Sequence, residues 1–538
     1  MSRGWESKDV ESQQLEAESA RRNSAVRKLT PEEAAIERQR ESLLLDRSRL
    51  DHELAETPHD RRRVQLRAAL DHVERQLADL VTSKVMLKPT IFREYDIRGV
   101  ADVDLPSDGI QLLGRAIGTY LQRNAGKKVN LGRDCRLSGG RLRDALLAGL
   151  LESGCEVTDV GVVPTPLLYF SCMHLHADGG VQITGSHNPA DYNGFKVVCG
   201  KTTIYGDEIQ KIYQMIVTND FASGSGSAQT HDIVDEYVDT VAPMFDWKRR
   251  IKVVIDAGNG TAGPAMTKLL KRLNCDPAEL YFEMDGAFPN HHPDPTVEKN
   301  LELLKAAVLK NGAELGIAFD GDADRIGAVD EKGRVVWGDY LLLIYAKEIL
   351  TRKPGSKFIG EVKCSQVLYD EIERLGGNPI MYRTGHSLIK AKMKEEHAEL
   401  AGEMSGHMFF ADRYFGYDDA LYAAARLMEI VANSGKPLSG QTDGLPAMVS
   451  TPEIRVDCSD ETKFEVIRIV AEKFKKTHKV VDVDGVRVLF DQGWGLARAS
   501  NTQPVLVLRF EAKNEQLLAA YQKEVEDAVA EARRQVGA

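Results

Sequence analysis

The sequence predicts an α/β protein with several domains, in which three mixed-sheet α/β domains follow a helical hairpin and precede a C-terminal α+β domain. The chain has 538 residues, which is more than one hydrophobic core usually organises. After residue 89, short apolar runs alternate with amphipathic stretches, as in α/β domains. From residue 447 onwards, short strand-like segments lie between two helical ones, which is typical of a small α+β domain.

The composition excludes several classes of protein. Hydrophobic residues make up 43% and charged residues 28%, as in globular rather than disordered or collagen-like chains. A net charge of −11 and a pI near 5.7 argue against nonspecific nucleic-acid binding. No run of about 18 apolar residues occurs, so we expect no integral membrane contact. The seven cysteines form no CxxC pair, and a cytoplasmic protein with reduced thiols is expected.

Helix signals begin close to the N-terminus. Residues 1–28 are polar and are predicted to form a disordered tail. Pro31 and Pro58 each follow a threonine N-cap, which predicts two helices in an αα-hairpin over residues 29–86. The apolar stripe of the second helix comprises Leu66, Leu70, Val73, Leu77 and Leu80. Three roles are open for this hairpin. It packs on itself or on the body, it forms a homo-oligomer as a coiled coil, or it docks to another protein or a membrane surface. Self-association is our hypothesis.

The body is divided by its strand pattern and by one linker. Apolar strands are expected at Lys128–Gly132, Gly179–Thr184, Ile251–Ile255, Leu315–Phe319 and Val335–Trp337. A stretch rich in proline and serine, Pro437–Pro452, is interpreted as a linker and hinge before the last domain. The expected domains are residues 87–232, 233–334, 335–446 and 447–538.

The segment Thr184–Pro189 follows one of these strands. Its small residues allow a tight loop that exposes the hydroxyl of Ser186, which is suited to act as a nucleophile or to carry a phosphoryl group. A polar turn that only ends the strand is the alternative. The G-x-S-x-G elbow is absent, which disfavours a triad serine hydrolase.

Three carboxylates alternate at Asp320, Asp322 and Asp324, directly after another strand. Residues two apart share a face in an extended or loop backbone, so these oxygens can converge on one divalent cation, with Mg²⁺ favoured when phosphate completes the shell. An EF-hand is the competing metal site, but it does not fit this sequence. Position six of an EF-hand loop requires glycine, and the residue here is Arg325. A surface acidic loop is the other alternative, but three aspartates so close repel one another without a cation.

Two further loops carry groups suited to a sugar phosphate. Gly402–His407 contains a carboxylate, a hydroxyl and an imidazole, which can hydrogen-bond sugar hydroxyls and move a proton. Arg498–Pro504 offers a guanidinium, hydroxyls and amides to a phosphate. Each of these segments alone is equally compatible with a polar loop.

Two other patterns are interpreted as structural. Gly258–Gly263 matches G-x-G-x-x-G, but no strand that ends in a ribose-binding acid stands out downstream, so a tight strand-to-helix turn is predicted instead of a dinucleotide site. His291–Pro295 contains two histidines and two prolines, and a rigid loop is predicted instead of a metal site.

Taken together, the segments TGSHNP, DGDADR, GEMSGH and RASNTQP, in this order, resemble the α-D-phosphohexomutase family. Phe92–Gly99 and Phe288–Pro295 add to the resemblance, which extends from about Leu87 to the C-terminus. Met404 and the run Tyr382–Lys390 favour the bacterial phosphomannomutase/phosphoglucomutase branch over phosphoglucosamine mutases. The resemblance implies four domains around a central cleft, the last of them mobile.

The resemblance also implies a reaction. Ser186 would be a phosphoserine, and Asp320, Asp322 and Asp324 would hold Mg²⁺ together with a phosphate oxygen of that serine. A phosphoryl group would pass between the 1 and 6 positions of mannose and glucose phosphates, with glucose 1,6-bisphosphate as activator and intermediate. The charge of the transferring group would be neutralised by the cation and nearby basic residues.

The remaining site residues follow from the same resemblance. Arg98, Lys196 and Arg325 are expected beside the transferring group. His407 is the candidate general base, with Lys196 as the rival and Arg98 assisting. The residues expected to bind substrate are Tyr95, Lys363, His386, Glu403, Ser405, Arg498, Ser500, Asn501 and Thr502. The alternatives are a phosphoglucosamine or phosphopentose mutase, and a non-catalytic sugar-phosphate-binding scaffold with the coiled coil as its working part.

Overall fold

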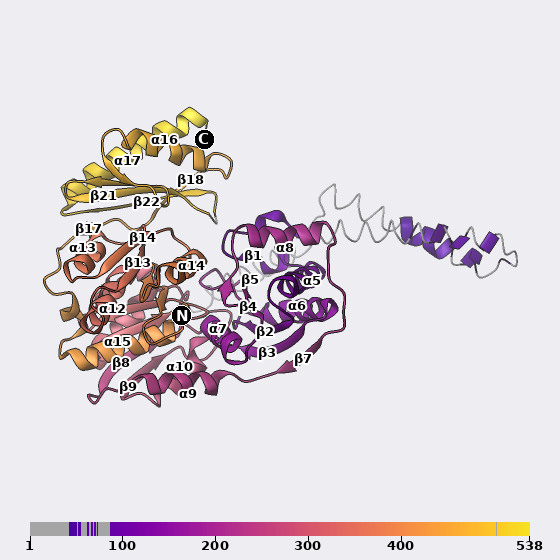
Figure 1. Cartoon of the computed structure of the whole chain (residues 1–538), viewed down its shortest axis with the longest axis horizontal. Helices are drawn as coiled ribbons and strands as arrows, with labels where there is room; N and C mark the ends of the chain where they lie inside the picture. The colour runs from indigo at the N-terminus through magenta and orange to yellow at the C-terminus, as the bar shows by residue number, and fades with distance from the viewer. Residues whose placement is uncertain are drawn as a thin grey trace, which may run out of the picture. The chain divides into compact units, whose positions relative to one another are not determined.

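The computed structural model describes residues 42–50, 52–54, 57, 62, 63, 66, 67, 69, 70, 73, 87–501 and 503–537. The chain forms two units, residues 1–86 and residues 87–538. The second unit is the α/β body, and it contains four sheets (Figure 1).

Within the first unit, the described residues from 42 to 54 and from 62 to 73 are helical. Arg62 donates a hydrogen bond to Glu53, with 3.2 Å between Nη2 and Oε2, and so joins the two helical stretches. These residues agree with the predicted helical hairpin. The predicted disordered tail, residues 1–28, lies outside the described residues.

The first sheet of the body has seven strands with mixed pairing. They are β1 (Ile97–Val100), β2 (Lys128–Arg133), β3 (Glu156–Val162), β4 (Gly179–Ile183), β5 (Tyr192–Cys199), β6 (Thr202–Thr203) and β7 (Ser227–Thr230). Its helices are η1 (Pro89–Ile91), α4 (Ala101–Asp104), α5 (Ser107–Asn124), α6 (Gly139–Ser153), α7 (Thr165–His174) and α8 (Asp207–Val217). The order is β1-β5-β4-β2-β3-β7, with β6 beside β5. Apolar residues of α5, α6 and α8 share one core with the sheet, whereas those of α7 join a core that continues into the second and third sheets.

The second sheet has five strands in the order β12-β11-β10-β8-β9. They are β8 (Ile251–Asp256), β9 (Cys275–Leu280), β10 (Leu315–Phe319), β11 (Ile326–Asp330) and β12 (Val335–Val336). Its helices are α9 (Val234–Val241), η2 (Ala242–Met244), α10 (Ala262–Leu270), η3 (Glu298–Leu301) and α11 (Glu302–Asn311). β8, β9 and β10 are parallel, and β11 is antiparallel to both of its neighbours. β12 pairs with β11, so the boundary predicted at residue 334 falls before the last strand of this sheet.

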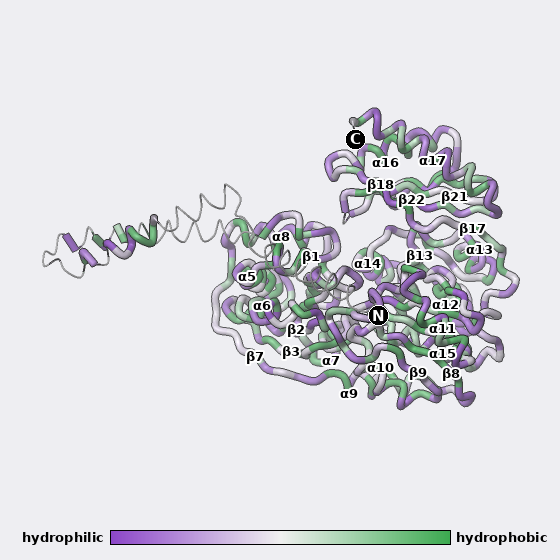
Figure 2. Tube along the Cα trace, turned by 180° about the vertical axis from the view of Figure 1, so that it is seen from behind, coloured by the Kyte–Doolittle hydropathy of each residue, from purple (hydrophilic) through white to green (hydrophobic). Residues whose placement is uncertain are grey.

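The third sheet has the order β14-β13-β15-β16. Its strands are β13 (Lys357–Glu361), β14 (Asn378–Tyr382), β15 (Leu400–Gly402) and β16 (Met408–Phe410). The helices are α12 (Gly338–Arg352), α13 (Gln366–Arg374), α14 (His386–Glu396), α15 (Ala420–Ser434) and η4 (Leu438–Thr442). The first three strands in this order are parallel, and β16 is antiparallel to β15. α15 is buried on nearly every side, and Figure 2 shows apolar residues along it, as expected of a helix inside a shared core.

The fourth sheet is antiparallel throughout, in the order β17-β22-β21-β20-β19 with β18 beside β22. Its strands are β17 (Val449–Ser450), β18 (Ile454–Asp457), β19 (Lys479–Val481), β20 (Val486–Phe490), β21 (Gly493–Ala499) and β22 (Val505–Ala512). α16 (Lys463–Phe474) and α17 (Glu515–Val536) pack against this sheet (Figure 1). The predicted class, mixed α/β sheets followed by an α+β domain, is confirmed. Among the described residues, none of the helices combines the length and the apolar character needed to cross a bilayer.

A buried arginine attaches the fourth sheet to the third. Arg487 on β20 is fully buried, and its Nη1 donates to the carbonyl oxygens of Val362 and Cys364, each at 2.7 Å. Its guanidinium lies 3.8 Å from the centre of the Trp494 ring. One side chain of the last domain therefore satisfies two carbonyl groups that follow β13.

Replacing Arg487 by Met should destabilise the body. The methionine side chain fills a similar space but leaves two buried carbonyl groups without hydrogen-bond donors. Each unsatisfied buried group lowers the free energy of unfolding by about 1–3 kcal/mol. We expect the free energy of unfolding to fall by about 3 kcal/mol, measured by urea denaturation. Arg455→Met is the matched control, because that side chain is exposed in the same domain. A change within about 0.5 kcal/mol, the size typical of surface substitutions, for both variants would contradict the anchoring role.

Candidate active site

Three loops occupy equivalent positions in the first three sheets. In each sheet a strand with a parallel neighbour ends in a loop and returns as an antiparallel strand: β4 to β5, β10 to β11, and β15 to β16. These loops carry Ser186, the aspartates from Asp320 to Asp324, and the segment from Glu403 to His407. The second and third loops join through a backbone bridge between Arg325 and His407. The fold therefore gathers three of the sequence-predicted motifs in one place.

The loop that carries Ser186 is fixed by a buried arginine. The Arg136 guanidinium donates hydrogen bonds to four backbone carbonyl groups of this loop, those of Ser186, Asn188, Pro189 and Tyr192. It also pairs with Asp134, with 3.1 Å between Nε and Oδ2. Ser186 has a φ of +47°, in the left-handed region, which costs an L residue about 1 kcal/mol or more. The contacts of Arg136 offset this strain and hold the serine in one orientation.

The Ser186 hydroxyl contacts the acidic loop of the second sheet. Its Oγ donates to Asp320 Oδ2 at 2.8 Å, although the two residues are 134 positions apart in sequence. The close approach requires Gly321, where a Cβ atom would lie 2.6 Å from the Ser186 carbonyl oxygen. Ser186 is 2% exposed and Asp320 is fully buried. The serine and the carboxylates singled out from the sequence therefore lie in direct contact.

The three aspartates of the acidic loop lie close together, and one lysine pairs with two of them. Asp320, Asp322 and Asp324 are fully buried, and each offers an oxygen within 4.8 Å of the others. Lys196 reaches them from β5, with its Nζ 2.7 Å from Asp322 Oδ2 and 2.5 Å from Asp324 Oδ2. Thr165, at the start of α7, donates to the same Asp322 oxygen at 2.5 Å. One ammonium group thus pairs with two of the three buried carboxyl groups.

The pKa values of these carboxyl groups differ because their neighbours differ. Burial raises the pKa of Asp320 well above its usual range, and the charges of Asp324 and Asp322 raise it further. Burial also opposes ionisation of Asp324, but Lys196 and His407 lower its pKa well below the usual range. Asp322 Oδ1 is buried and has no hydrogen-bond partner in the described part of the chain. Mg²⁺ fits this set, since the donors are hard oxygens and a cation would relieve both the repulsion and the unpaired oxygen.

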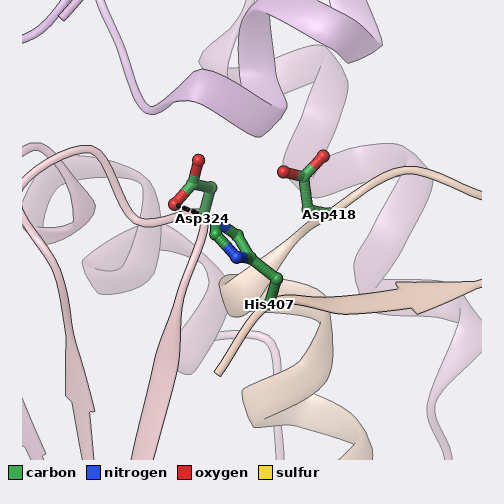
Figure 3. Close-up of side chains that lie close together, drawn as sticks. All are labelled: Asp324, His407 and Asp418. Carbon is green, nitrogen blue, oxygen red and sulfur yellow. Dashed lines mark ion pairs between the residues drawn. The ribbon is translucent and has the colours of Figure 1, made fainter. Parts of the chain in front are cut away.

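His407 connects the acidic loop with the loop of the third sheet. It forms an ion pair with Asp324, which is the dashed line in Figure 3, and its Nε2 lies 3.2 Å from Asp324 Oδ1. Its Nδ1 lies 2.6 Å from Glu403 Oε2. Burial lowers the pKa of this imidazole, but Asp324 and Glu403 raise it, and it reaches about 9. Ser405 Oγ lies 3.2 Å from His407 Nδ1. Glu403 and Ser405 therefore orient the ring through the nitrogen that faces away from Asp324.

Three more sequence-predicted residues lie at this site. Arg98 on β1 donates to Asn188 Oδ1 at 3.1 Å, so it lies beside the serine loop. Arg325 Nε is 3.3 Å from His407 Nε2. The His386 ring, at the start of α14, is centred 5.7 Å from that of His407. All three add donors around the serine and the aspartates.

The loop of the fourth sheet, between β21 and β22, reaches the first domain. Asn501 Nδ2 donates to the Tyr95 hydroxyl at 2.7 Å, and that hydroxyl donates to the Thr384 carbonyl at 2.8 Å. Tyr95 therefore links the first, third and fourth domains. Arg498 Nε is 3.0 Å from Asp484 Oδ2.

Lys363, predicted to bind a phosphate, contacts two carboxylates. Its Nζ is 2.6 Å from Glu453 Oε1 and 3.7 Å from Glu361 Oε1. Ser500 is 6% exposed in the β21–β22 loop. Thr502, another predicted phosphate ligand, lies outside the described residues. A phosphate that binds Lys363 would have to compete with Glu453.

The Lys363–Glu453 pair predicts a pH dependence. The charge of Lys363 lowers the pKa of Glu453 from 4.5 to about 2. A depressed folded-state pKa contributes stability above pH 4.5 that is lost as the pH falls towards 2, by up to about 3 kcal/mol. Urea titrations at several pH values should show a shallower acid slope for Glu453→Gln than for the wild type. Asp491→Asn, which removes an exposed carboxylate, should keep the wild-type slope; equal slopes for all three proteins would disprove the coupling.

Several residues that build this site were not identified from the sequence. Asp134 and Arg136 directly follow β2, so the rule that site residues lie at strand ends would have pointed to them. Asp418, within 4.8 Å of Asp324 and His407, precedes a helix in a segment without a recognisable pattern (Figure 3). The predicted turn at Gly258–Gly263 leads from β8 into α10, as expected.

The chain is similar to known proteins over most of its length. Family models for phosphoglucomutase/phosphomannomutase match in order, with alpha/beta/alpha domains I, II and III at residues 89–223, 235–333 and 337–448 and the C-terminal domain at 453–528. A phosphomannomutase/phosphoglucomutase from Pseudomonas syringae pv. tomato is 47% identical over 431 residues, which is 80% of this chain and 93% of the relative.

Solved structures extend the comparison. A phosphoglucomutase/phosphomannomutase family protein from Burkholderia thailandensis has a TM-score of 0.79 at 44% identity and covers 83% of this chain and 98% of that one. An N-acetylphosphoglucosamine mutase variant from Aspergillus fumigatus, in complex with glucose 1,6-bisphosphate, has a TM-score of 0.56 at 14% identity and covers 85% and 98%. The latter likeness shows the fold alone. With four family models matched in order and a relative of 47% identity, the chain belongs to the phosphoglucomutase/phosphomannomutase family.

Proposed function

We propose that this member of the family transfers a phosphoryl group reversibly between the 1 and 6 positions of hexose phosphates, through a phosphoserine at Ser186. The observation that carries the proposal is the 2.8 Å hydrogen bond from Ser186 Oγ to Asp320 within a group of three buried aspartates and one lysine. A hydroxyl beside converging carboxylates is suited to phosphoryl transfer, because such a site can place a divalent cation against the transferring group.

The proposed transfer proceeds in two halves. The substrate hydroxyl attacks the phosphorus of phosphorylated Ser186. The P–Oγ bond breaks with its electron pair on Ser186 Oγ, which takes up a proton, and hexose 1,6-bisphosphate forms. His407, in its neutral form, takes the proton of the attacking hydroxyl. Because its pKa is about 9, the neutral form is the minor one at neutral pH, and Lys196 is the rival base. Mg²⁺ held by the three aspartates would neutralise charge on the phosphoryl oxygens. Lys196, Arg325 and Arg98 contribute fixed positive charge to the same region.

The bisphosphate must then turn over, so that its other phosphate faces Ser186 and returns to that oxygen. One distal site has to accept the non-reacting phosphate in both orientations. We assign it to Arg498, Asn501 and Thr502, with Ser500 and Lys363 beside them. The contact between Tyr95 and Asn501 supports closure of the last domain over the cleft, which limits loss of the intermediate to water.

The names of the relatives favour mannose and glucose phosphates as substrates. A phosphoglucosamine mutase is the alternative that keeps the chemistry and changes the sugar. Values of kcat/KM for mannose, glucose and glucosamine 1-phosphates, each with Mg²⁺ and glucose 1,6-bisphosphate as activator, test the assignment. Mannose and glucose substrates should be preferred; preference for the amino sugar would overturn the choice of substrate but not the transfer itself.

The helical hairpin at residues 29–86 is proposed to mediate self-association. Light scattering on the full chain and on a chain that begins at residue 87 tests this. More chains per assembly are expected in the full chain than in the shorter one. The same number of chains per assembly in both would remove the hypothesis.

A further inference from the structure

A cavity of about 440 Å³ lies outside the transfer site just described. It is lined by α7, the turn between β5 and β6, α14 with the residues that follow it, and the segment from 411 to 417. It therefore lies where the first domain meets the third. None of Ser186, the three aspartates or His407 lines it.

The cavity combines aromatic walls with basic side chains. Tyr169 and Tyr417 pack edge to face, with ring centres 5.5 Å apart, and Phe415 adds a third ring that is 46% exposed. Lys201 and Lys394 are exposed at the lining, and neither has an ion pair with a described residue. Flat apolar surface beside ammonium groups is suited to an aromatic anion.

The acidic and hydroxyl groups of the lining support the same ligand class. Glu399 is the acidic residue of the lining, and its carboxylate pairs with Lys353 at 2.9 Å. The Tyr169 hydroxyl is buried and has no hydrogen bond of normal geometry among the described residues. The cavity therefore keeps an excess of positive charge and one buried donor.

A third lysine joins the cavity to the transfer site. Lys390 lines the cavity, and its Nζ lies 4.3 Å from the centre of the Tyr169 ring and 3.0 Å from Asp418 Oδ1. Asp418 in turn has an oxygen within 4.8 Å of ligand atoms of Asp324 and His407, which Figure 3 shows together. Asp418 is fully buried and the Lys390 side chain is 11% exposed, so water screens this chain of charges weakly.

We propose that this cavity is a second, regulatory ligand site that binds a small aromatic anion and competes with Asp418 for the ammonium group of Lys390. A sugar phosphate lacks the flat apolar body that three aromatic side chains would cover, so the ligand differs in class from the substrate. Binding would weaken the Lys390–Asp418 pair and shift the charge beside His407. Coupling between two sites typically amounts to 5–150-fold in affinity.

The aromatic sulfonate 8-anilinonaphthalene-1-sulfonate is a suitable probe, used with the full chain and followed by fluorescence and calorimetry. We expect one saturable site per chain. Lys201→Glu/Lys394→Glu should weaken binding by about tenfold or more, since two attractions become repulsions. Lys248→Glu/Lys271→Glu makes the same change of net charge at exposed positions outside the cavity, and its affinity should stay at the wild-type value.

Two results would overturn the second site itself: equal affinities for both double variants and the wild type, or complete displacement of the probe by glucose 1-phosphate in simple competition. We expect instead that saturating probe changes the affinity for glucose 1-phosphate at least about fivefold without excluding it. No change in that affinity would also overturn the regulatory role. Failure of glucose 1-phosphate to bind at all would count against the proposed substrate. The comparison of the double variants does not depend on that substrate, so it would still decide whether the cavity binds the anion.

Discussion

Ser186→Ala is expected to lower the turnover of glucose 1-phosphate by about 10⁴-fold or more while binding of the sugar phosphate remains measurable. The substitution removes the oxygen that carries the phosphoryl group, and loss of a covalent nucleophile typically costs this much. The backbone of the loop should keep its place, because the four Arg136 hydrogen bonds go to carbonyl groups and do not involve the serine hydroxyl. A coupled assay for glucose 6-phosphate and calorimetric titration measure the two effects.

The control for this variant is Ser227→Ala, an exposed serine on β7 of the same domain, which should retain wild-type turnover. Turnover by Ser186→Ala within about tenfold of the wild type would exclude a phosphoserine mechanism at this position. Loss of sugar-phosphate binding as well as turnover would indicate that the loop is disturbed, and Ser186→Cys, which keeps the size of the side chain, would then distinguish the two causes.

Lys196→Met should make the stability of the body depend strongly on Mg²⁺. Lys196 neutralises Asp322 and Asp324, both fully buried, and removal of one partner from a buried ion pair costs about 3–5 kcal/mol. We expect this loss in the presence of EDTA. Millimolar Mg²⁺ should recover a large part of it, because a ligand that binds only the folded state stabilises that state.

Thermal unfolding with EDTA and with Mg²⁺ measures this dependence. The increase in unfolding temperature on adding Mg²⁺ should be larger for Lys196→Met than for the wild type, since the wild-type aspartates already share an ammonium group. Lys268→Met removes a surface pair with Asp235 and should change stability by no more than about 1 kcal/mol under either condition. No response to Mg²⁺ in either protein would contradict a cation site at the three aspartates. Turnover by Lys196→Met should fall by about 10²-fold or more, as expected when a preorganised charge is removed.

Much of the fold and part of the site could be predicted because their signals are local. Strands such as β4 and β10 are short apolar runs, and Ser186 and Asp320 lie in the loops that follow them. The alternation of apolar runs with helical stretches, together with the ends of the strands, therefore locates both loops. The alternation of carboxylates likewise predicts a shared ligand position. Family resemblance then assigns roles that no spacing rule provides, such as that of His407.

What the sequence does not reveal depends on pairing between distant segments. Arg487 is one arginine among many in the sequence, and nothing near it indicates that it donates to carbonyl groups 123 and 125 positions away. The ion pair of Lys363 with Glu453 bridges two domains and is equally invisible in sequence. Such contacts are set by how the domains pack, which residue patterns within one element do not encode.

Phosphopeptide mapping tests the central claim most directly. The full chain is incubated with Mg²⁺ and glucose 1,6-bisphosphate, digested and analysed by mass spectrometry, and a second portion is treated with excess glucose 6-phosphate before digestion. We predict one added phosphoryl group, located on Ser186 and removed by the sugar phosphate. Phosphate on any other residue, or an unmodified Ser186 under conditions in which the enzyme turns over, would contradict the account.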